Sequence, residues 1–431
     1  MSCMKTGSSS EDLIEEIKPI TLNPSMLTRL SISFIIIGCS LSAENWPRFR
    51  GPNGTGISDS KIPVKWTDSN SKWKTILPAT GHGSPVLWDD SIFLLCADEE
   101  KGTRIAVGAN AKTGKILWSK KFTATKHKQH KQNSFASSTP TTDSRHVYFS
   151  WGTPENLTLV AMTHKGQVAW KKDLNPVEGG HGFGASPIIH KNLLVINNDQ
   201  DGESSLLALD KSTGKIIWET SRNSKRLTYS TPITYSASDR EEELIFTNWT
   251  HGITGINPVN GKVNWENSVF NQSSKERAIG SPIIAQDLVI GTCGFVTKLK
   301  HIVALRPKGK HMEEAWRIEK SVPHIPTPLL IGKNLFLWND QGIATCVEAA
   351  TGKVQWSERT VRSGKFFSSP IAANGIIYCI DSNGKMIVMR GDGKFEILAE
   401  NDLGQRCNAT PAIADNVMYI RTYTELIAIA K

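Results

Sequence analysis

The sequence of 431 residues predicts an all-β fold, an eight-bladed β-propeller, from three observations. A hairpin unit recurs, in which an apolar strand, a polar turn with Thr-Gly-Lys and a second apolar strand ending in Trp follow one another, as in residues 207–218. A small residue followed by Pro opens an apolar run in every repeat, at Pro85, Pro140, Pro187, Pro232, Pro282, Pro328, Pro370 and Pro411. These Pro positions are 41 to 55 residues apart, and a period in the forties with β patterning is typical of propellers.

Each hairpin unit predicts the third and fourth strands of one blade. In residues 207–218, Gly214 supplies the positive φ that a tight turn needs, and Lys215 keeps the turn in water. The Trp at the end of a unit is a large apolar plate that we expect to pack between neighbouring blades rather than against a ligand. These tryptophans are Trp73, Trp118, Trp170, Trp218, Trp265, Trp316 and Trp356, and the hairpin at 390–397 lacks one.

The number of blades follows from the two ends of the chain. Eight Pro positions open blades, but only seven hairpins follow them, because the chain stops after the apolar run 426–430. We expect the missing outer strand at residues 72–77, where Trp73 stands one repeat, 45 residues, before Trp118. A last blade built from both ends leaves no open sheet edge, which would otherwise invite aggregation. The propeller is therefore assigned to residues 66–431.

Two segments precede the folded part of the chain. Residues 1–25 are a polar, acidic extension that fits no strand, and Met26 is an alternative start that would leave them untranslated. Residues 26–43 combine a basic segment with an apolar core too short to span a bilayer, which is typical of a secretory signal. Cleavage after Ala43 and cleavage before a lipid-modified Cys39 both fit the sequence. We expect an exported protein of the periplasm or cell envelope, lipid-anchored in the second case.

Residues 44–65 are expected to form an irregular arm laid against the propeller, because 46–56 are rich in Pro, Gly and Arg. Arg48 and Arg50 of this arm have two interpretations. They are either a binding patch or part of a plug in which the arginines pair with carboxylates or carbonyls at the rim, and we favour the plug.

The hairpins resemble a known repeat over most of the chain. Thr-Gly-Lys-x-x-Trp is similar to the repeat of pyrroloquinoline-quinone (PQQ) dehydrogenase-type propellers, a group that also contains the lipoprotein of the outer-membrane β-barrel assembly machinery. The segment Asn45-Trp-Pro-Arg-Phe-Arg-Gly-Pro-Asn-Gly-Thr-Gly56 resembles a signature that opens exported PQQ-like repeat proteins of planctomycete-type bacteria. This resemblance is specific for the fold and weak for function.

The predicted connectivity places a shared site on one face of the propeller, which we call the funnel face. The segments before each Pro and the turns between second and third strands meet around the channel, on the face opposite the Thr-Gly-Lys turns. Each polar residue there, taken alone, is typical of a solvated loop, but their convergence favours a ligand site. The candidates are His82, His181, Phe183, Tyr229, Trp249, His251, Arg277, His324, Lys365, Phe366, Arg406 and Asn408.

An enzyme resembling the quinoprotein dehydrogenases would bring a vicinal Cys-Cys pair, a Ca²⁺ cluster of Glu, Asn and Asp, and a catalytic Asp. This chain has no adjacent cysteines; those of the propeller stand singly, at Cys96, Cys293, Cys346, Cys379 and Cys407. The turn at 198–201 has oxygen atoms suited to Ca²⁺, but such turns are routine hairpins. We therefore assign no catalytic residue, metal or cofactor, and keep PQQ with Ca²⁺ as the alternative.

These observations lead to a function of the binding class. The net charge of +9 favours anionic envelope components, and nucleic acid is not expected for an exported chain. We predict a non-catalytic, monomeric binding or scaffold module for envelope proteins or a carbohydrate-like ligand, with membrane contact only through the lipid anchor. The alternatives are a PQQ-dependent oxidoreductase and a sugar-binding or lyase-like propeller that uses the His and Tyr of the funnel.

Overall fold

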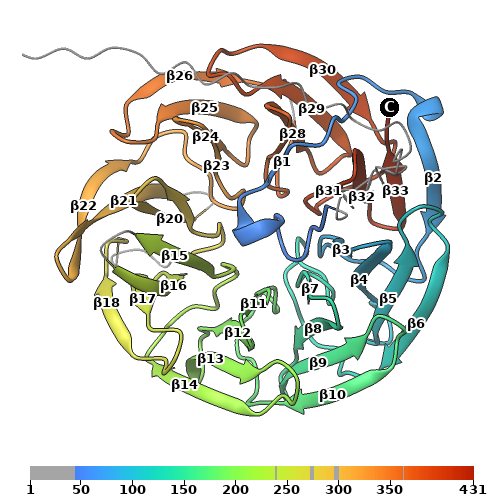
Figure 1. Ribbon diagram of the computed structural model, residues 1–431, viewed down its shortest axis with the longest axis horizontal. Coiled ribbons are helices and arrows are strands. Elements are labelled where there is room, and N and C mark those ends of the chain that lie inside the picture. Colours follow the sequence, from blue (N-terminus) through green and yellow to red (C-terminus); the bar gives the residue numbers. More distant parts are fainter. Residues whose placement is uncertain (1–43, 238–239, 272–275, 296–299, 363) are drawn as a thin grey trace, which may run out of the picture. The chain divides into compact units, whose positions relative to one another are not determined.

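The computed structural model describes residues 44–237, 240–271, 276–295, 300–362 and 364–431. Residues 1–43, with the predicted extension, signal and Cys39, lie outside them. The described chain is all β, and eight sheets stand around a central channel as the blades of a propeller (Figure 1). This confirms the predicted fold. Seven of the sheets have four strands, and the sheet of blade 7 has a fifth, β1 (Ile57–Ser58). No helix in these ranges is long and apolar enough to cross a membrane.

The blades follow one another along the chain, and the strands of each blade are given in order from the channel to the outer edge. Blade 1 is β3 (Val86–Trp88), β4 (Ser91–Ala97), β5 (Arg104–Asn110) and β6 (Ile116–Phe122). Blade 2 is β7 (Thr141–Thr142), β8 (His146–Gly152), β9 (Leu157–Thr163) and β10 (Val168–Asp173). Blade 3 is β11 (Ile188–His190), β12 (Leu193–Asn198), β13 (Ser204–Asp210) and β14 (Ile216–Arg222). Blade 4 is β15 (Ile233–Ala237), β16 (Arg240–Asn248), β17 (Gly252–Ile256) and β18 (Val263–Asn267).

The second half of the chain repeats this order. Blade 5 is β19 (Ile283–Ala285), β20 (Leu288–Gly294), β21 (Lys300–Lys308) and β22 (His311–Ile318). Blade 6 is β23 (Leu329–Ile331), β24 (Asn334–Trp338), β25 (Ile343–Glu348) and β26 (Val354–Arg359). Blade 7 is β27 (Ile371–Ala373), β28 (Ile376–Ile380), β29 (Lys385–Arg390) and β30 (Ile397–Asp402). Blade 8 is β31 (Ala412–Ala414), β32 (Val417–Arg421), β33 (Glu425–Ile429) and, from the other end of the chain, β2 (Ser71–Ile76).

Blade 8 closes the ring as the repeat count predicted. β2 pairs antiparallel with β33, and Trp73 lies opposite Ala428. Two 3-10 turns, η1 (Pro52–Gly54) and η2 (Asp68–Asn70), lie before it. Because β2 supplies the outer strand, the last sheet keeps the four strands of the other blades.

The repeated tryptophans lie between blades. Six indole Nε1 groups donate to a backbone carbonyl of the next blade at 2.6–3.0 Å, those of Trp73, Trp118, Trp170, Trp218, Trp316 and Trp356. The indole of Trp265 differs, because it donates to Oε2 of Glu243 in its own blade at 2.8 Å. The turn glycine receives the indole: Gly214 has φ 73°, and a Cβ there would come within 2.7 Å of Cε3 of Trp170. Glycine is thus required both for the turn and for the close approach of the ring.

The arm occupies one end of the channel (Figure 1). The backbone of Trp46 pairs with that of Leu87 in blade 1. Arg48 donates from Nη2 to the carbonyl of Pro232 at 2.5 Å, and Arg50 from Nη1 to that of Pro328 at 2.7 Å. β1 (Ile57–Ser58) then adds a parallel strand to β27 in blade 7. The arginines therefore bind inner-strand carbonyls, as expected of a plug.

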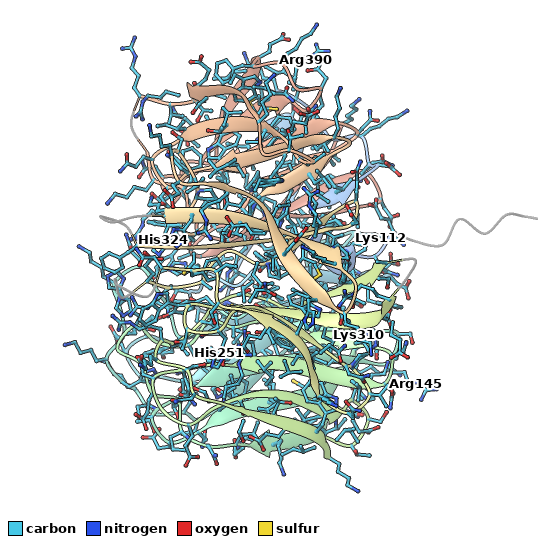
Figure 2. All side chains as sticks on the ribbon, turned by 90° about the vertical axis from the view of Figure 1, so that its left-hand side faces the viewer. Lys112, Arg145, His251, Lys310, His324 and Arg390 are labelled. Atoms are coloured by element: carbon cyan, nitrogen blue, oxygen red, sulfur yellow. The ribbon has the colours of Figure 1, made fainter. Side chains whose placement is uncertain are left out.

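The two faces of the ring carry different loops (Figure 2). His251 and His324 lie on one side, and Lys112, Arg145 and Lys310 on the other. Lys112 belongs to a Thr-Gly-Lys turn, whereas His324 precedes an inner strand. This is the separation of faces that the connectivity predicted, and it places the converging segments at the end of the channel away from the arm.

Candidate ligand-binding site

A cavity of about 490 Å³ lies in the channel, and every blade contributes residues to its wall. Phe49 of the arm belongs to the lining as well. Because the arm enters from the opposite end of the channel, Phe49 forms the floor of the cavity and the funnel face its opening. The volume is that of a small-molecule site.

A ring of hydroxyl side chains surrounds the neck of the cavity. The residue before each Pro alternates between Ser and Thr around the eight blades: Ser84, Thr139, Ser186, Thr231, Ser281, Thr327, Ser369 and Thr410. Seven of the eight neighbouring pairs are joined by a hydrogen bond of 2.9–3.1 Å, in which the backbone N–H of one residue donates to the hydroxyl oxygen of the next. All eight side chains are buried, and seven line the cavity. The ring thus joins seven of the eight pairs of neighbouring blades at the axis.

A second layer stands above this ring, two residues earlier in each segment. Successive side chains of extended backbone point to opposite sides, so residues two apart share a side. All eight residues of this layer line the cavity, namely His82, Ser137, Gly184, Tyr229, Ile279, Ile325, Phe367 and Asn408. Five of the eight are polar or aromatic, and the other three are Gly184, Ile279 and Ile325.

Cationic and imidazole groups form the wall between blades 2 and 5. Arg277 donates from Nη2 to Nδ1 of His181 at 3.1 Å. The ring of His181 stacks on that of His130, with centroids 4.7 Å apart and planes at 13°. The backbone of Arg277 is fixed by paired hydrogen bonds with Gly294, at 3.0 and 3.2 Å. This wall is therefore held in place from several loops.

The other walls hold two more imidazoles and two aromatic rings. His324 is 5% exposed, and its two ring nitrogens have no hydrogen-bond partner among the described residues. His82 lies beside Asn408, with Nε2 and Nδ2 3.4 Å apart. Phe295 and Phe367 add apolar surface. Imidazole, hydroxyl and aromatic groups thus face one space.

The cavity has a one-sided charge. Four His, one Arg and one Lys belong to its described lining, and Asp and Glu do not. Burial is the first cause that lowers the pKa of His82, His181 and His324 to about 4, and neighbouring arginines add to it at His82 and His181. Burial also lowers the pKa of Arg277 and raises that of Tyr229. At neutral pH the imidazoles of His82, His181 and His324 are uncharged donors and acceptors, and Tyr229 keeps its proton.

Half of the residues predicted for the funnel line this cavity. They are His82, His181, Tyr229, Arg277, His324 and Asn408. The sequence reasoning missed Phe49, His130, Phe295 and Phe367. A sequence signal for Phe367 exists, since it stands two residues before the hydroxyl of its blade. Phe49 and His130 had none, because the path of the arm and of the loop at 120–131 is not periodic.

The prediction was wrong for three aromatic residues, which are buried outside the cavity. Phe366 is fully buried beside Trp338, with ring centroids 5.6 Å apart. Phe183 is buried in the core between blades 2 and 3. Trp249 is buried as well, and its Nε1 donates to the carbonyl of Asn271 at 2.8 Å. In each case apolar burial holds a side chain that the loop position alone assigned to the channel.

It was also wrong for three polar residues, which do not belong to the lining. His251 lies 3.1 Å from Oε1 of Glu266, with which it forms an ion pair when protonated. Arg406 is exposed and stacks on Tyr423, and Lys365 lies in the segment that leads to Phe367. His251 and Arg406 thus contact residues outside the lining, and Lys365 is exposed.

The calcium-dependent quinone cofactor does not fit this site. Ca²⁺ takes about six to eight oxygen ligands, usually with carboxylates among them, and the described lining has no carboxylate. In the oxygen-rich turn at 198–201, Asp199 is already bound by Arg222 at 3.2 Å and by Ser224 at 2.5 Å. Within the described ranges no group of three or more His, Cys, Asp or Glu is arranged for a metal, and the five cysteines are buried and unpaired.

Comparisons with known proteins agree with the fold. A family model described as outer membrane protein assembly factor BamB matches residues 103–358 and 301–430. No curated protein matches the chain. BamB from Moraxella catarrhalis is similar in structure with a TM-score of 0.60 at 12% identity, over 84% of this chain and 97% of that one. A europium-containing methanol dehydrogenase gives a TM-score of 0.64 at 12% identity, over 90% of this chain and 89% of that one. Quinohemoprotein alcohol dehydrogenase from Comamonas testosteroni gives a TM-score of 0.62 at 11% identity, over 90% of this chain and 81% of that one.

Proposed function

Because the chain belongs to the family of the outer membrane protein assembly factor BamB, we propose that it is a non-catalytic binding module of the cell envelope that holds a carbohydrate-like ligand in its central cavity. The observation that carries this proposal is the lining of the 490 Å³ cavity, which combines hydroxyl, imidazole and amide groups with aromatic rings. Sugars need both, hydrogen-bonding groups for their hydroxyls and apolar planes for their C–H faces.

The state of the polar groups favours binding over catalysis. Tyr229 keeps its proton because burial raises its pKa, and the imidazoles of His82, His181 and His324 are weak bases because burial lowers theirs. A general acid or base works best when its pKa lies near the working pH. The described lining also lacks the pair of carboxylates that glycoside hydrolysis uses.

A second candidate function, a scaffold for envelope proteins, is favoured by the outer strands. Ile76, Leu117, Ile217 and Val354 are large apolar residues at 45–77% exposure, each on the outermost strand of a different blade. The outer edge of such a strand presents unpaired backbone groups to which an extended segment of a partner can add. Export to the envelope is part of this proposal.

A glycan array with the purified chain tests the carbohydrate proposal. The expected result is a defined set of bound glycans, lost in His181→Ala, whose side chain lines the cavity, and kept in His251→Ala, whose side chain does not. Loss of binding in both variants, or no binding by the wild type, contradicts the proposal. Crosslinking in intact envelopes then tests the scaffold, and reduction of PQQ with Ca²⁺ present would favour the oxidoreductase instead.

A further inference from the structure

The buried arginines of the described chain differ in what they bind. Arg48, Arg50, Arg104, Arg277 and Arg421 are all buried. Four of them donate to at least one backbone carbonyl oxygen. Arg277 is 6% exposed, and its guanidinium donates to Nδ1 of His181 and to no oxygen of the described residues. It is also the one of the five that lines the cavity.

A buried guanidinium without an oxygen partner is costly. Desolvation disfavours its charge, and a hydrogen bond to a neutral imidazole nitrogen returns less than one to a carboxylate. No ion pair joins Arg277 to a described acidic residue; Arg226 repels its charge and Asp201 attracts it. The position therefore favours an anion that arrives with the ligand.

The neighbours of Arg277 present further donors to the same space. Since Nδ1 of His181 accepts from Arg277, the proton of the neutral ring lies on Nε2. Nδ1 of His130 accepts from the backbone N–H of Gln132 at 3.3 Å, so its proton lies on Nε2 as well. Two stacked imidazoles thus offer N–H donors beside the guanidinium. A planar carboxylate can accept from such a fork with both oxygens.

The rest of the cavity suits an uncharged, hydroxylated ring. His324 has two buried nitrogens without a partner among the described residues. Asp340 favours a positive charge on its ring, and Lys300 and Arg277 disfavour it. Phe367 and Phe295 supply apolar planes. One end of the cavity is thus built for charge, and the remainder for polar contacts and ring faces.

We propose that the ligand is an acidic sugar, a hydroxylated ring bearing a carboxylate, and that Arg277 and His181 bind the carboxylate. The inference rests on the proposed carbohydrate function, because it names the class of sugar. The carboxylate supplies the counterion that the described lining lacks. The hydroxyls of the sugar form hydrogen bonds with His324 and with the polar residues of the layer above the hydroxyl ring.

Titration calorimetry with two forms of one probe tests the charge. Trigalacturonate and its methyl ester have the same rings and hydroxyls and differ in the carboxylate charge. The full chain is expected to bind the acid at least about tenfold more tightly than the ester, which corresponds to about 1.4 kcal/mol. In Arg277→Gln this ratio should fall to near one with the ester affinity kept. Arg406→Gln, which removes the same charge from the same face outside the cavity, should keep the ratio.

The outcomes separate this inference from the function on which it rests. Equal binding of acid and ester by the wild type overturns the acidic sugar and leaves a carbohydrate module. Arg277-dependent binding of inorganic phosphate without binding of either sugar also overturns it, since the cavity is then a simple anion site. Failure of both sugars and of every glycan on the array removes the proposed function itself.

Discussion

The two ends of the channel use buried polar groups in opposite ways. At the arm end, Arg48 and Arg50 are bound to the carbonyls of Pro232 and Pro328, and the arm occupies this end of the channel. At the funnel end, Arg277 donates to an imidazole, and His324 has two unpartnered nitrogens among the described residues. The first arrangement uses its hydrogen bonds to hold the fold. The second leaves donors and acceptors facing a cavity, where a ligand can form hydrogen bonds with them.

The largest expected effect is a pH dependence of the free energy of unfolding that arises at the funnel end and not at the arm end. Folding lowers the pKa of His82, His181 and His324 from 6.5 to about 4, first through burial. Above pH 6.5 both states are uncharged at these groups and their contribution to stability is complete. As the pH falls from 6.5 to about 4, the unfolded chain takes up protons that the folded chain resists, so the free energy of unfolding falls. The arm-end arginines stay charged throughout this range.

Urea unfolding across this pH range measures the effect. The variant with His82→Gln, His181→Gln and His324→Gln should lose less stability than the wild type between pH 6.5 and 4, because three titrating groups are gone. Parallel curves for the two proteins would mean that the acid sensitivity arises from carboxylates elsewhere. An effect from three groups together should exceed that of a single substitution.

The next effect breaks the arm end. Arg50→Ala removes donors to the carbonyls of Pro328 and Thr55 and leaves unfilled volume beside Gly56. We expect a loss of about 3 to 5 kcal/mol, because charged hydrogen bonds and buried volume disappear together. Arg145→Ala, at an exposed position, should change stability by about 0.5 kcal/mol or less. Denaturation curves that coincide for both variants would show that the arm does not stabilise the ring.

The hydroxyl ring is the boundary between the two ends, and its contribution is smaller. Thr410→Val keeps the shape but leaves the backbone N–H of Ser369 without its acceptor, a hydrogen bond of 2.9 Å. The expected loss is about 1 to 3 kcal/mol, the cost of an unsatisfied buried donor. Thr424→Val at an exposed position is the control. A variant as stable as the wild type would mean that the blades are joined at the axis by packing alone.

The comparison also shows where sequence reasoning succeeds. The repeat arithmetic predicted the missing outer strand at residues 72–77, because such a strand has one possible source, the other end of the chain, and β2 lies at Ser71–Ile76. It failed between Phe366 and Phe367, adjacent residues of which one lies in the core and the other in the cavity. The hydroxyl residue before Pro370 lines the cavity, and side chains two residues apart in an extended segment point to the same side. This spacing selects Phe367 rather than Phe366 for the cavity. His130 could not be placed, because its stacking on His181 joins two loops far apart in sequence.

The smallest effect is expected at the centre of the funnel wall. Arg277→Gln removes a buried charge that no described oxygen accepts, so relief of desolvation offsets the lost hydrogen bond to His181. We expect the free energy of unfolding to stay within about 1 kcal/mol of the wild type or to rise. The measurement is the urea midpoint at neutral pH, beside Arg50→Ala. A loss as large as that of Arg50→Ala would place Arg277 among the structural arginines, and the funnel would then hold no arginine reserved for a ligand.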